Sequence, residues 1–308
     1  MLTDIFVFSL AFFLVIRGAI LATKYATRLA ESFRLSSYTV GFIIVAIVSI
    51  LPETFIAINS ALTGNSAFGF GMLLGSNVAD LTLVFVGIIL LSRRNLRVEY
   101  KILESHAFYP FVLLLPIILG LDGYLSRPEG LTLIVAGCIF YYIALKRGSS
   151  DIQTHHTTHR TKSIAFLFLS VILLLVGSHF TVLSATNIAT TIGISPVLIA
   201  MLVVGLGTTL PEFLFSLKAM KLKDDSLAIG DILGTVLADA TIVVGLLALI
   251  SPFSFPHTII YVAGVFMVAA SFILFSFMRS GRVVTYREAF VLFIFWLTFV
   301  FVESIVNF

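Results

Sequence analysis

Two short motifs place a proline and a carboxylate inside apolar segments of the chain. The first reads Val-Ala-Ile-Val-Ser-Ile-Leu-Pro-Glu and ends at Glu53, and the second reads Val-Gly-Leu-Gly-Thr-Thr-Leu-Pro-Glu and ends at Glu212. Proline lacks an amide N–H and a carboxylate resists leaving water, so both residue types are unfavourable inside an apolar helix. Their joint occurrence marks each motif as a candidate functional site.

Each motif is followed by a second acid that has a hydroxyl one helical turn before it. Ser76 and Asp80 lie in Gly-Ser-Asn-Val-Ala-Asp, and Thr235 and Asp239 lie in Gly-Thr-Val-Leu-Ala-Asp. In a helix the spacing i, i+4 puts the hydroxyl and the carboxylate on one face. Asp231 lies one further turn before Thr235, and we expect it in an inner vestibule rather than in the central cluster.

Each proline also frees backbone oxygen near the acids. Pro52 cannot donate a hydrogen bond to the carbonyl of Val48, and Pro211 cannot donate one to the carbonyl of Gly207. Proline suits the first turn of a new helix, whose end attracts a carboxylate such as that of Glu53. Carboxylate, hydroxyl and carbonyl oxygens without soft ligands favour a hard cation, and Ca²⁺ more than a transition metal.

The two motifs are copies of one unit, separated by an offset of 159 residues. The offset holds without a gap from Gly18 to Asp80 of the first copy. Matched pairs include Gly18 with Gly177, Ser36 with Ser195, Pro52 with Pro211, Gly75 with Gly234, and Asp80 with Asp239. A register of this length indicates an internal duplication.

The composition indicates a polytopic membrane protein. Of the 308 residues, 59% are hydrophobic and 11% are charged, whereas about 25% of residues are charged in soluble domains. The mean hydropathy is +1.11. No basic residue precedes the first apolar run, so we expect that run to be retained rather than cleaved as a signal peptide. Segments long enough to span a bilayer predict ten transmembrane helices, near residues 5–23, 38–62, 68–91, 106–121, 131–145, 164–183, 196–219, 227–250, 257–278 and 288–306.

The basic residues predict how these spans are oriented. With the N-terminus outside, 17 of the 19 Lys and Arg residues fall in cytoplasmic segments, while Arg127 falls outside and Arg17 lies within the first span. Both termini are then extracellular, and the net charge of +3 reflects anchoring to an anionic inner leaflet rather than binding to nucleic acid. The expected location is the cell (plasma) membrane.

Five spans separate the two copies, so the second copy is inverted relative to the first. The predicted fold class is therefore an all-α polytopic membrane protein, with about ten transmembrane helices in two inverted-topology repeats of five and broken helices at the ion site. We expect an N-terminal five-helix repeat at residues 1–145, a cytoplasmic linker at 146–163 and a C-terminal inverted repeat at 164–308. In secondary transporters of this plan, the substrate binds near the bilayer midplane where the repeats meet.

The linker contains His155, His156 and His159, whose spacing could bind zinc on a helix. We interpret the segment instead as a solvated loop, because it is polar, rich in threonine and without apolar periodicity. Cys138 is the only cysteine, so no intrachain disulfide can form, and we expect its thiol to face lipid or fill the core.

The doubled motifs resemble those of the cation/Ca²⁺ exchanger superfamily, and within it the Na⁺/Ca²⁺ exchanger branch. The resemblance rests on the two Leu-Pro-Glu motifs and the two Ala-Asp motifs, and it covers both repeats and the ten-span layout. It implies a secondary active antiporter that exchanges Ca²⁺ for Na⁺ by alternating access at a midplane carboxylate site. It implies neither an enzymatic activity nor a cofactor, and the expected partners are the transported ions and the lipid bilayer.

The resemblance also implies roles for individual residues. Glu53 and Glu212 would be the principal Ca²⁺ ligands, helped by the carbonyls of Ser49 and Thr208. Asp80 and Asp239 would border the centre. Na⁺ would bind on either side of Ca²⁺, at the carbonyls of Ala46 and Gly205 and the hydroxyls of Ser76, Thr209 and Thr235.

Two departures from the family pattern leave the counter-ion open. Ile50 lacks the hydroxyl that its repeat partner Thr209 keeps, which weakens one sodium site. Asp80 adds a fourth acid where relatives often have Asn, and it could carry a proton or a further cation. A Ca²⁺/H⁺ exchanger is therefore the alternative, although the Gly-Asn-Ala-Thr-Glu-like motif of that branch is absent.

Two other classes of protein were weighed against an exchanger. An intramembrane protease could use Asp80 and Asp239 as a catalytic dyad, but the chain has no His-Glu-x-x-His motif and its acids accompany a duplicated cation cage. A passive cation channel needs the same oxygen chemistry. It differs from an exchanger in that its flux ignores the gradient of a counter-ion.

Overall fold

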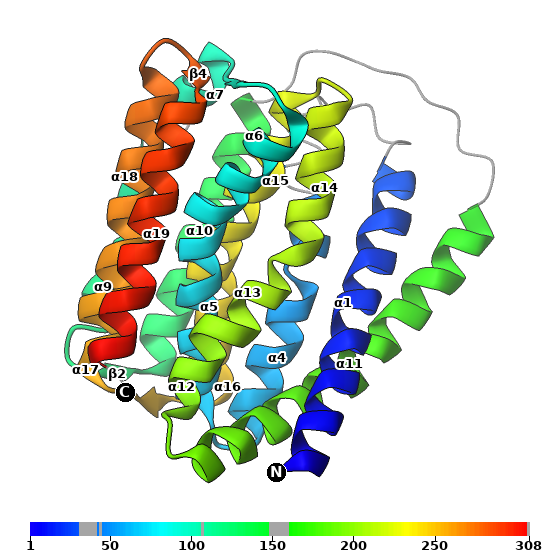
Figure 1. The fold of residues 1–308 in the computed structure, drawn as a ribbon, viewed down its shortest axis with the longest axis vertical. Helices are drawn as coiled ribbons and strands as arrows, with labels where there is room; N and C mark the ends of the chain where they lie inside the picture. Colours follow the sequence, from blue (N-terminus) through cyan, green and yellow to red (C-terminus); the bar gives the residue numbers. More distant parts are fainter. Residues whose placement is uncertain (31–41, 43–44, 106–107, 148–159, 307–308) are drawn as a thin grey trace.

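The computed structural model describes the chain except for residues 31–41, 43–44, 106–107, 148–159 and 307–308. The described part is almost entirely helical (Figure 1). Within the described residues, seven helical segments are long and apolar enough to cross a membrane. These are Leu2–Ala22, Ser66–Ser92, Ala165–Ile192, Pro196–Lys221, Asp225–Ile250, His257–Arg279 and Tyr286–Val306.

The three remaining predicted spans are helical as well, and two of them are interrupted. They are formed by α3 (Ala46–Ser49) with α4 (Leu51–Leu62), by α8 (Tyr109–Val112) with α9 (Leu115–Leu119), and by α10 (Arg127–Arg147). Prolines stand in the first turns of α4, α8 and α9, where a missing N–H is tolerated. The prediction of about ten transmembrane helices with breaks is confirmed.

Element bounds repeat along the chain with the 159-residue offset of the motifs. The matched elements are α3 with α13 (Gly205–Thr208), α4 with α14 (Leu210–Lys221), α5 (Ser66–Ala79) with α15 (Asp225–Ala238), the π-helical η2 (Asp80–Val84) with η4 (Asp239–Val243), and α10 with α19 (Tyr286–Val306). The correspondence between α10 and α19 lies beyond Asp80, where the quoted sequence matches end. The repeated unit therefore extends further in structure than the motifs show.

Matching capping interactions start the last helix of each half. Glu129 accepts hydrogen bonds from the amide and hydroxyl of Ser126, at 2.8 and 2.6 Å. Glu288 accepts the same two bonds from Thr285, at 2.7 and 2.9 Å. A hydroxyl residue followed three positions later by Glu is the capping-box pattern, so the sequence itself specifies where both helices begin.

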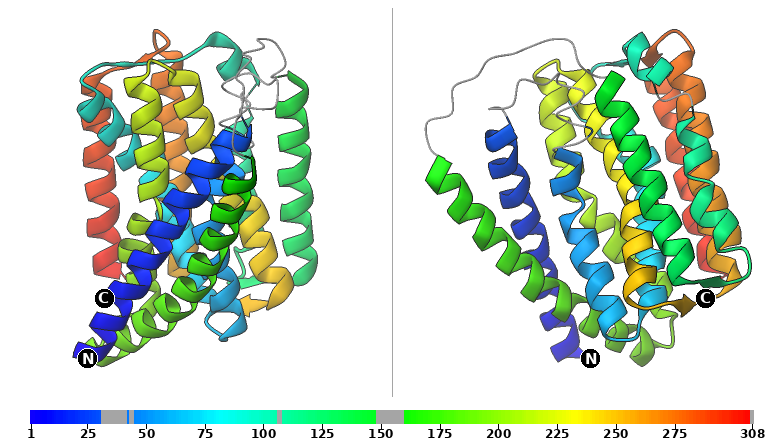
Figure 2. Two further views of the ribbon diagram at one scale, coloured as in Figure 1. Left: turned by 90° about the vertical axis from the view of Figure 1, so that its right-hand side faces the viewer. Right: turned by 180° about the vertical axis from the view of Figure 1, so that it is seen from behind.

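The two halves run in opposite directions through the molecule. In Figure 1, α4 extends from the centre toward the end that holds both chain termini, whereas α14 extends toward the opposite end. The longest helices, α1 (Leu2–Ala30) and α11 (Arg160–Ile192), form a tilted pair at one side, as the rotated views in Figure 2 also show. Glycine lets them approach closely, since a Cβ on Gly177 would lie 2.8 Å from the carbonyl oxygen of Ala11.

The remaining elements complete the two halves. They are α6 (Phe85–Ser92), α7 (Tyr100–Ser105), α12 (Pro196–Ile199), the π-helical η3 (Ala200–Val204), α16 (Val244–Ile250), α17 (His257–Ile259), the π-helical η5 (Ile260–Gly264) and α18 (Val265–Arg279). Two short antiparallel sheets then tie the halves together. The strand β1 (Leu96–Arg97) pairs with β4 (Val283–Val284), and β2 (Tyr124–Leu125) pairs with β3 (Phe253–Ser254).

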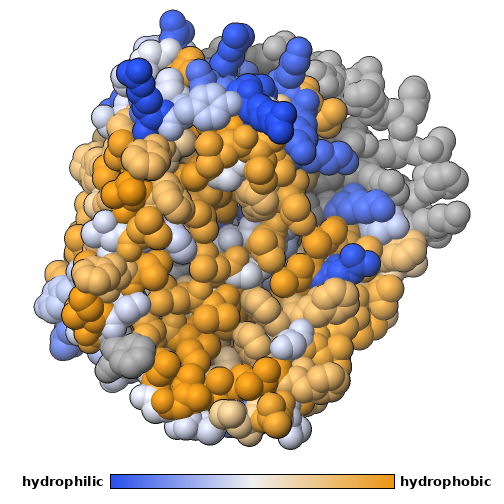
Figure 3. Space-filling model, in the orientation of Figure 1, coloured by the Kyte–Doolittle hydropathy of each residue, from blue (hydrophilic) through white to orange (hydrophobic). Residues whose placement is uncertain are grey.

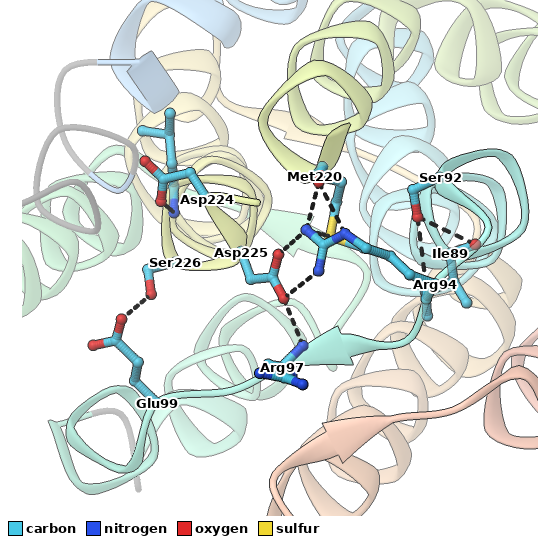
Figure 4. Close-up of polar contacts among 10 residues, drawn as sticks. Ile89, Ser92, Arg94, Arg97, Glu99, Met220, Asp224, Asp225 and Ser226 are labelled. Atoms are coloured by element: carbon cyan, nitrogen blue, oxygen red, sulfur yellow. Dashed lines mark hydrogen bonds and ion pairs between the residues drawn. The ribbon is translucent and has the colours of Figure 1, made fainter. Parts of the chain in front are cut away.

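A polar clamp joins the halves at one end of the molecule (Figure 4). The Arg94 guanidinium, which follows α6, forms an ion pair with Asp225 at the start of α15 and donates to the carbonyl of Met220 near the end of α14. The amide of Arg97 also donates to Asp225, at 2.8 Å. The turn between α14 and α15 is therefore held by residues from the first half.

The outer surface is apolar over most of its height. Figure 3 shows a broad hydrophobic surface with hydrophilic side chains concentrated at the end where α7 and β4 lie. Among the seven segments, Ser66–Ser92 and Asp225–Ile250 are the most enclosed. In each of them, 83% of an apolar stretch of 18 residues is buried. Cys138 is exposed on this surface, as expected of a lipid-facing thiol. The polytopic membrane fold predicted from composition is thus confirmed, and its interior is built around α5 and α15.

Candidate cation site

The proline motif of the first repeat forms a break between two helices. α3 ends at Ser49, and Ile50 connects it to α4 with backbone angles φ −70° and ψ −2°. Pro52 lies in the first turn of α4, where a proline interrupts no hydrogen bond of that helix. Glu53 follows in the same turn and is 1% exposed. Its carboxylate therefore lies at the positively polarised end of α4.

The second motif repeats this geometry in the other half. α13 ends at Thr208, and Thr209 connects it to α14 with φ −75° and ψ −7°. Pro211 and Glu212 lie in the first turn of α14, and Glu212 is fully buried. Two half-helices thus start at the centre of the molecule and run toward opposite ends, each with a carboxylate in its first turn.

Carbonyl oxygens flank both breaks. The carbonyls of Val48 and Gly207 lack the donor that an unbroken helix would supply, because the residue four positions later is proline. The carbonyls of Ala46 and Gly205 each accept a backbone hydrogen bond from the residue that links the two half-helices, at 3.0 and 3.3 Å. A carbonyl has two lone pairs, so the Ala46 oxygen keeps capacity for a further contact, whereas the Gly205 oxygen also accepts from the Thr208 hydroxyl at 3.0 Å.

The second pair of predicted acids lies at distortions of the neighbouring helices. Asp80 is the first residue of η2 and Asp239 is the first residue of η4, so a π-helical segment follows α5 and α15 at equivalent positions. Both side chains are buried. Single π-helical turns inside α-helices occur frequently at functional sites, because the wider turn redirects side chains and leaves backbone groups irregular.

Most of the buried oxygens in this region lack a protein partner. Among the described residues, the atoms without a hydrogen bond include Oε2 of Glu53, both carboxylate oxygens of Glu212 and Asp239, Oδ1 of Asp80 and the hydroxyl of Thr235. Buried polar groups are nearly always hydrogen-bonded in folded proteins. A cluster of unsatisfied oxygen atoms contributed by both repeats is what a bound cation would satisfy.

The structure brings the four predicted acids together. Asp80 and Asp239 each lie within direct electrostatic range of Glu53 and of one another. Glu212 lies within the same range of Glu53 and Asp80. Glu53 is also within hydrogen-bonding reach of the Thr208 side chain, which belongs to the other repeat.

No basic side chain balances these acids in the part of the chain that the structure describes. The ion pairs found there are those of the N-terminal amine with Asp4 and of Arg94 with Asp225, and neither includes an acid of the cluster. No three His, Cys, Asp or Glu side chains of the described residues converge closely enough to hold a metal ion by themselves. Hydroxyl and carbonyl oxygens would therefore have to complete any cation site.

The predicted hydroxyl ligands are Ser76, Thr209 and Thr235, whereas Thr208 is predicted to bind through its carbonyl. The hydroxyls of Ser76, Thr208 and Thr209 each donate to a carbonyl of their own helical segment, at 3.0, 3.0 and 2.9 Å. The Thr235 hydroxyl has no partner. All four side chains are buried, so their oxygens face the protein interior rather than lipid.

Close packing across the repeats positions these hydroxyls beside the breaks. A Cβ on Gly205 would lie 3.0 Å from the backbone nitrogen of Ser76, and a Cβ on Gly234, which precedes Thr235, would lie 2.6 Å from the Cβ of Ala46. Each hydroxyl of one repeat is thereby placed beside the segment that leads into the break of the other repeat.

The structure corrects one expectation, because Asp231 does not lie in a vestibule. Its side chain is fully buried and accepts hydrogen bonds from Ser49 at 3.2 Å and from Ser216 at 3.0 Å. It also lies within electrostatic range of Asp80 and Glu212. Its repeat partner is the apolar residue Met72, so the duplicated motif does not predict a place for Asp231 among the clustered acids. The available signal was that Asp231 is a second acid in the same apolar segment as Asp239.

The histidines of the predicted linker, His155, His156 and His159, lie outside the described residues. The interpretation of this segment as a solvated loop rather than a zinc site, and the boundaries of the linker at 146–163, remain predictions.

The chain is similar in sequence to known exchanger proteins. The family model described as sodium/calcium exchanger protein matches residues 3–146 and 162–304, which is nearly the whole chain in two parts. The sodium/calcium exchanger MaX1 of Methanosarcina acetivorans is 22% identical over 337 residues, covering 94% of this chain and 95% of MaX1.

Two solved structures share the fold. The sodium-calcium exchanger NCX_Mj superposes with a TM-score of 0.71 at 22% identity, covering 96% of both chains. The H⁺/Ca²⁺ exchanger CAX superposes with a TM-score of 0.81 at 14% identity, covering 99% of this chain and 85% of that one. The fold is therefore shared by exchangers that are named for different counter-ions.

Proposed function

The chain belongs to the sodium/calcium exchanger protein family, and on that premise we propose that it is a secondary active antiporter that exchanges Ca²⁺ for Na⁺ across the membrane. The observation that carries the proposal is the cluster of buried carboxylate oxygens without protein partners, contributed by Glu53 and Asp80 from one repeat and Glu212 and Asp239 from the other. A bound cation supplies the missing contacts and also neutralises the negative charge of the carboxylates.

We assign the ligands as follows. Glu53 and Glu212 bind Ca²⁺ with the carbonyls of Ser49 and Thr208, an assignment supported by the position of all four residues at the ends and starts of the broken helices. Asp80 and Asp239 border the centre. The flanking Na⁺ positions use the carbonyls of Ala46 and Gly205 and the hydroxyls of Ser76, Thr209 and Thr235.

Coupling follows from the energetic cost of an empty cluster. Each unpaired carboxylate at the middle of a membrane helix costs about 2.5–3.5 kcal/mol on insertion scales. A cluster emptied of cations is therefore disfavoured when it is closed off from water, whereas a cluster filled by Ca²⁺ or by Na⁺ is not. Passage between the two faces then requires a bound ion in each direction, which is exchange rather than leak.

The architecture suggests which parts move. The pair formed by α1 and α11 packs mainly against itself and lies at one side of the molecule. The remaining helices are joined across the repeats by two short sheets and by the ion pair of Arg94 with Asp225. Phe12 of α1 fills the space beside Gly207 at the second break. A shift of the α1–α11 pair would therefore open or cover the site without disturbing its ligands.

A Ca²⁺/H⁺ exchanger is the second candidate, and two observations favour it. Ile50 is a buried apolar residue where Thr209 supplies a hydroxyl, so the sodium ligands are unequal on the two sides. Asp80 keeps an unpaired oxygen within range of Glu53, and a proton would relieve the repulsion there as a cation would. Sodium is favoured by the unpaired Thr235 hydroxyl, a ligand for Na⁺ with no role in proton transfer from an acid, and by the relative MaX1.

Reconstituted protein separates these candidates. Vesicles containing the protein are loaded with Na⁺ and diluted into Na⁺-free buffer with Ca²⁺, and uptake of Ca²⁺ is compared with that driven by an imposed pH gradient. Uptake driven by outward Na⁺ establishes the proposal, and uptake that responds only to the pH gradient establishes the alternative. Ca²⁺ flux that follows its own gradient and ignores both would identify a channel and overturn both.

We further propose that the protein lies in the cell membrane with both termini outside, and that residues 1–145 and 164–308 are the two repeats joined by a cytoplasmic linker at 146–163. This orientation is supported by the 17 of 19 Lys and Arg residues that fall in the predicted cytoplasmic segments. In a variant without Cys138, a cysteine at exposed Asp122 should react with an impermeant maleimide in intact cells. A cysteine at exposed Ser280 should react only after permeabilisation, and the opposite pattern would invert the topology.

A further inference from the structure

Asp231 differs from the other acids of the central cluster in its hydrogen bonds. Glu53, Asp80, Glu212 and Asp239 each have at least one buried oxygen without a partner. Asp231 is equally buried, yet Oδ1 accepts from the Ser49 hydroxyl at 3.2 Å and Oδ2 accepts from the Ser216 hydroxyl at 3.0 Å. Its oxygens are already used by the protein, so its role differs from that of an ion ligand.

The two donors connect Asp231 to both helix breaks. Ser49 is the last residue of α3 and directly precedes the linking residue of the first break. Ser216 lies on α14, one turn after Glu212. A single carboxylate on α15 therefore joins the ligand segment of the first repeat to the ligand helix of the second.

Neighbouring contacts bring α15 close enough for these bonds. A Cβ on Gly234, one turn after Asp231, would collide with the carbonyl oxygen of Phe42 and would lie 2.6 Å from the Cβ of Ala46. The absence of a side chain at position 234 is thus required for α15 to lie against the segment that ends at Ser49.

The arrangement has no counterpart in the first repeat. The repeat partners of Asp231 and Ser216 are Met72 and Ala57, and both are buried apolar residues. The partner of Ser49 is Thr208, whose hydroxyl donates to Gly205 within its own helix at 3.0 Å. Among the hydrogen bonds of the described residues, it is at the first break that a hydroxyl donates to a carboxylate of the opposite repeat, whereas the hydroxyls of Thr208 and Thr209 donate within their own segment.

The asymmetry coincides with the difference between the two linking residues. Thr209 holds the second break locally, because its hydroxyl donates to the carbonyl of Leu206 at 2.9 Å. Ile50 cannot make such a bond. The hydrogen bond from Ser49 to Asp231 is the side-chain bond that the first break makes instead.

We propose that Asp231 is a positioning residue that holds Ser49, and with it the ion-coordinating break of the first repeat, from the second repeat. The proposal rests on the proposed function in that the Ser49 carbonyl is taken to be a Ca²⁺ ligand. Asp231 acts through Ser49 rather than by touching the ion. Losing the bond lets the Ser49 carbonyl move, which weakens ion binding more than it slows turnover of the loaded protein.

The test compares Asp231→Ala, Asp231→Asn, Ser49→Ala and the double variant of Asp231→Ala with Ser49→Ala in vesicles. We expect Asp231→Ala and Ser49→Ala each to raise the Ca²⁺ concentration for half-maximal uptake about tenfold, with little change in maximal rate. The double variant should be no worse than either single one, because both remove the same bond. Asp231→Asn should restore most of the affinity, since its carboxamide oxygen still accepts from Ser49.

Two results would overturn the proposal. If Asp231→Asn binds Ca²⁺ as poorly as Asp231→Ala, the charge matters and Asp231 is an ion ligand. If the two single effects multiply in the double variant, the residues act separately. Ser271→Ala is the matched control, because its hydroxyl is buried and donates only within its own helix, to Val268 at 2.7 Å.

A second measurement tests the Asp231–Ser49 link independently of whether the protein is a Ca²⁺ exchanger. The thermal unfolding midpoint in detergent, without added ions, is measured for the single and double variants. Non-additive shifts for Asp231 and Ser49 support the link even if the wild type transports no Ca²⁺. Additive shifts contradict it whatever the transport assay shows.

Discussion

The carboxylate of Glu53 lies within hydrogen-bonding reach of the Thr208 side chain, so an acid at the first helix break meets a hydroxyl residue at the second. The two residues are far apart in sequence and belong to opposite repeats. Their proximity, and the packing of α13 beside α4, indicate that the two breaks face one site rather than two separate ones. A change at either break should therefore affect ions bound by both.

We predict that Glu53→Gln and Glu212→Gln each abolish counter-ion-driven Ca²⁺ uptake. Both carboxylates are buried and keep unpaired oxygens, and removing a negative charge from a divalent-cation site removes much of its affinity. Uptake is measured in vesicles that contain equal amounts of inserted protein. Glu129→Gln is the control, because Glu129 caps α10 away from the cluster. Near-normal uptake by either cluster variant would contradict the ligand assignment.

Much of this fold could be predicted from the sequence, because its main signals are local. Apolar spans give the helices, prolines give the breaks at Ile50 and Thr209, and the doubled motifs give the inverted repeat. The acids at 53, 80, 212 and 239 stood out because carboxylates are rare in apolar segments. The confirmed parts are the membrane fold, the ten helices and the family.

Other features depend on contacts that no local pattern encodes. Asp231 was placed in a vestibule because its repeat partner is Met72, but its partner across the molecule is Ser49, which is 182 positions away. The π-helical segments after Ala79 and Ala238 also escaped prediction, since periodicity does not separate a π-helical turn from an α-helical one. The clamp of Arg94 on Asp225 likewise joins distant loops.

We predict that Asp80→Asn makes Ca²⁺ uptake less sensitive to pH without abolishing it. Protons and cations compete for a cluster of like charges, so uptake by the wild type should fall as the pH falls. Removing one acid removes one place where a proton can displace a cation. Initial uptake rates are measured across a pH series at constant driving gradient. An unchanged profile would show that Asp80 takes no part in this competition.

We predict that Asp225→Ala destabilises the protein by about 1.5–3 kcal/mol, the usual range for hydrogen bonds to a charged group. Asp225 accepts from the Arg94 guanidinium and, at 2.8 Å, from the Arg97 amide, and its side chain is 10% exposed. Unfolding in detergent is followed by denaturant titration. Arg93→Gln, a neighbouring exposed change, should alter stability by less than about 0.5 kcal/mol. Equal effects of the two variants would mean that the clamp contributes nothing specific.

We predict that Gly75→Ala and Gly234→Ala both impair folding or transport. An added Cβ at Gly75 would collide with the backbone carbonyl of Met201, and one at Gly234 with that of Phe42. Backbone cannot move aside as a side chain can, so the cost should reach about 1–3 kcal/mol or more. Gly264→Ala is the control, because it meets only side-chain carbons of Ile117 and Ile260, at 3.1 Å or more. Yield of folded protein and uptake per molecule are measured for all three.

The last prediction concerns Ile50, where the two breaks differ most. Thr209 provides a hydroxyl at the second break, and Ile50 provides none at the first. If Na⁺ is the counter-ion, Ile50→Ser should lower the Na⁺ concentration needed for half-maximal Ca²⁺ efflux, because it adds an oxygen ligand. Thr209→Val should raise that concentration, because it removes one. Truncating Ile50 also costs about 1–3 kcal/mol of packing, so Ile50→Ala is needed as the control of similar size without a hydroxyl.

If Ile50→Ser and Ile50→Ala give the same Na⁺ curve while Thr209→Val shifts it, a side-chain oxygen at position 50 does not bind Na⁺, and the first break must coordinate the ion through backbone carbonyls. If none of these variants changes the response because efflux follows only a pH gradient, the protein is a Ca²⁺/H⁺ exchanger, and the apolar side chain of Ile50 is consistent with that counter-ion.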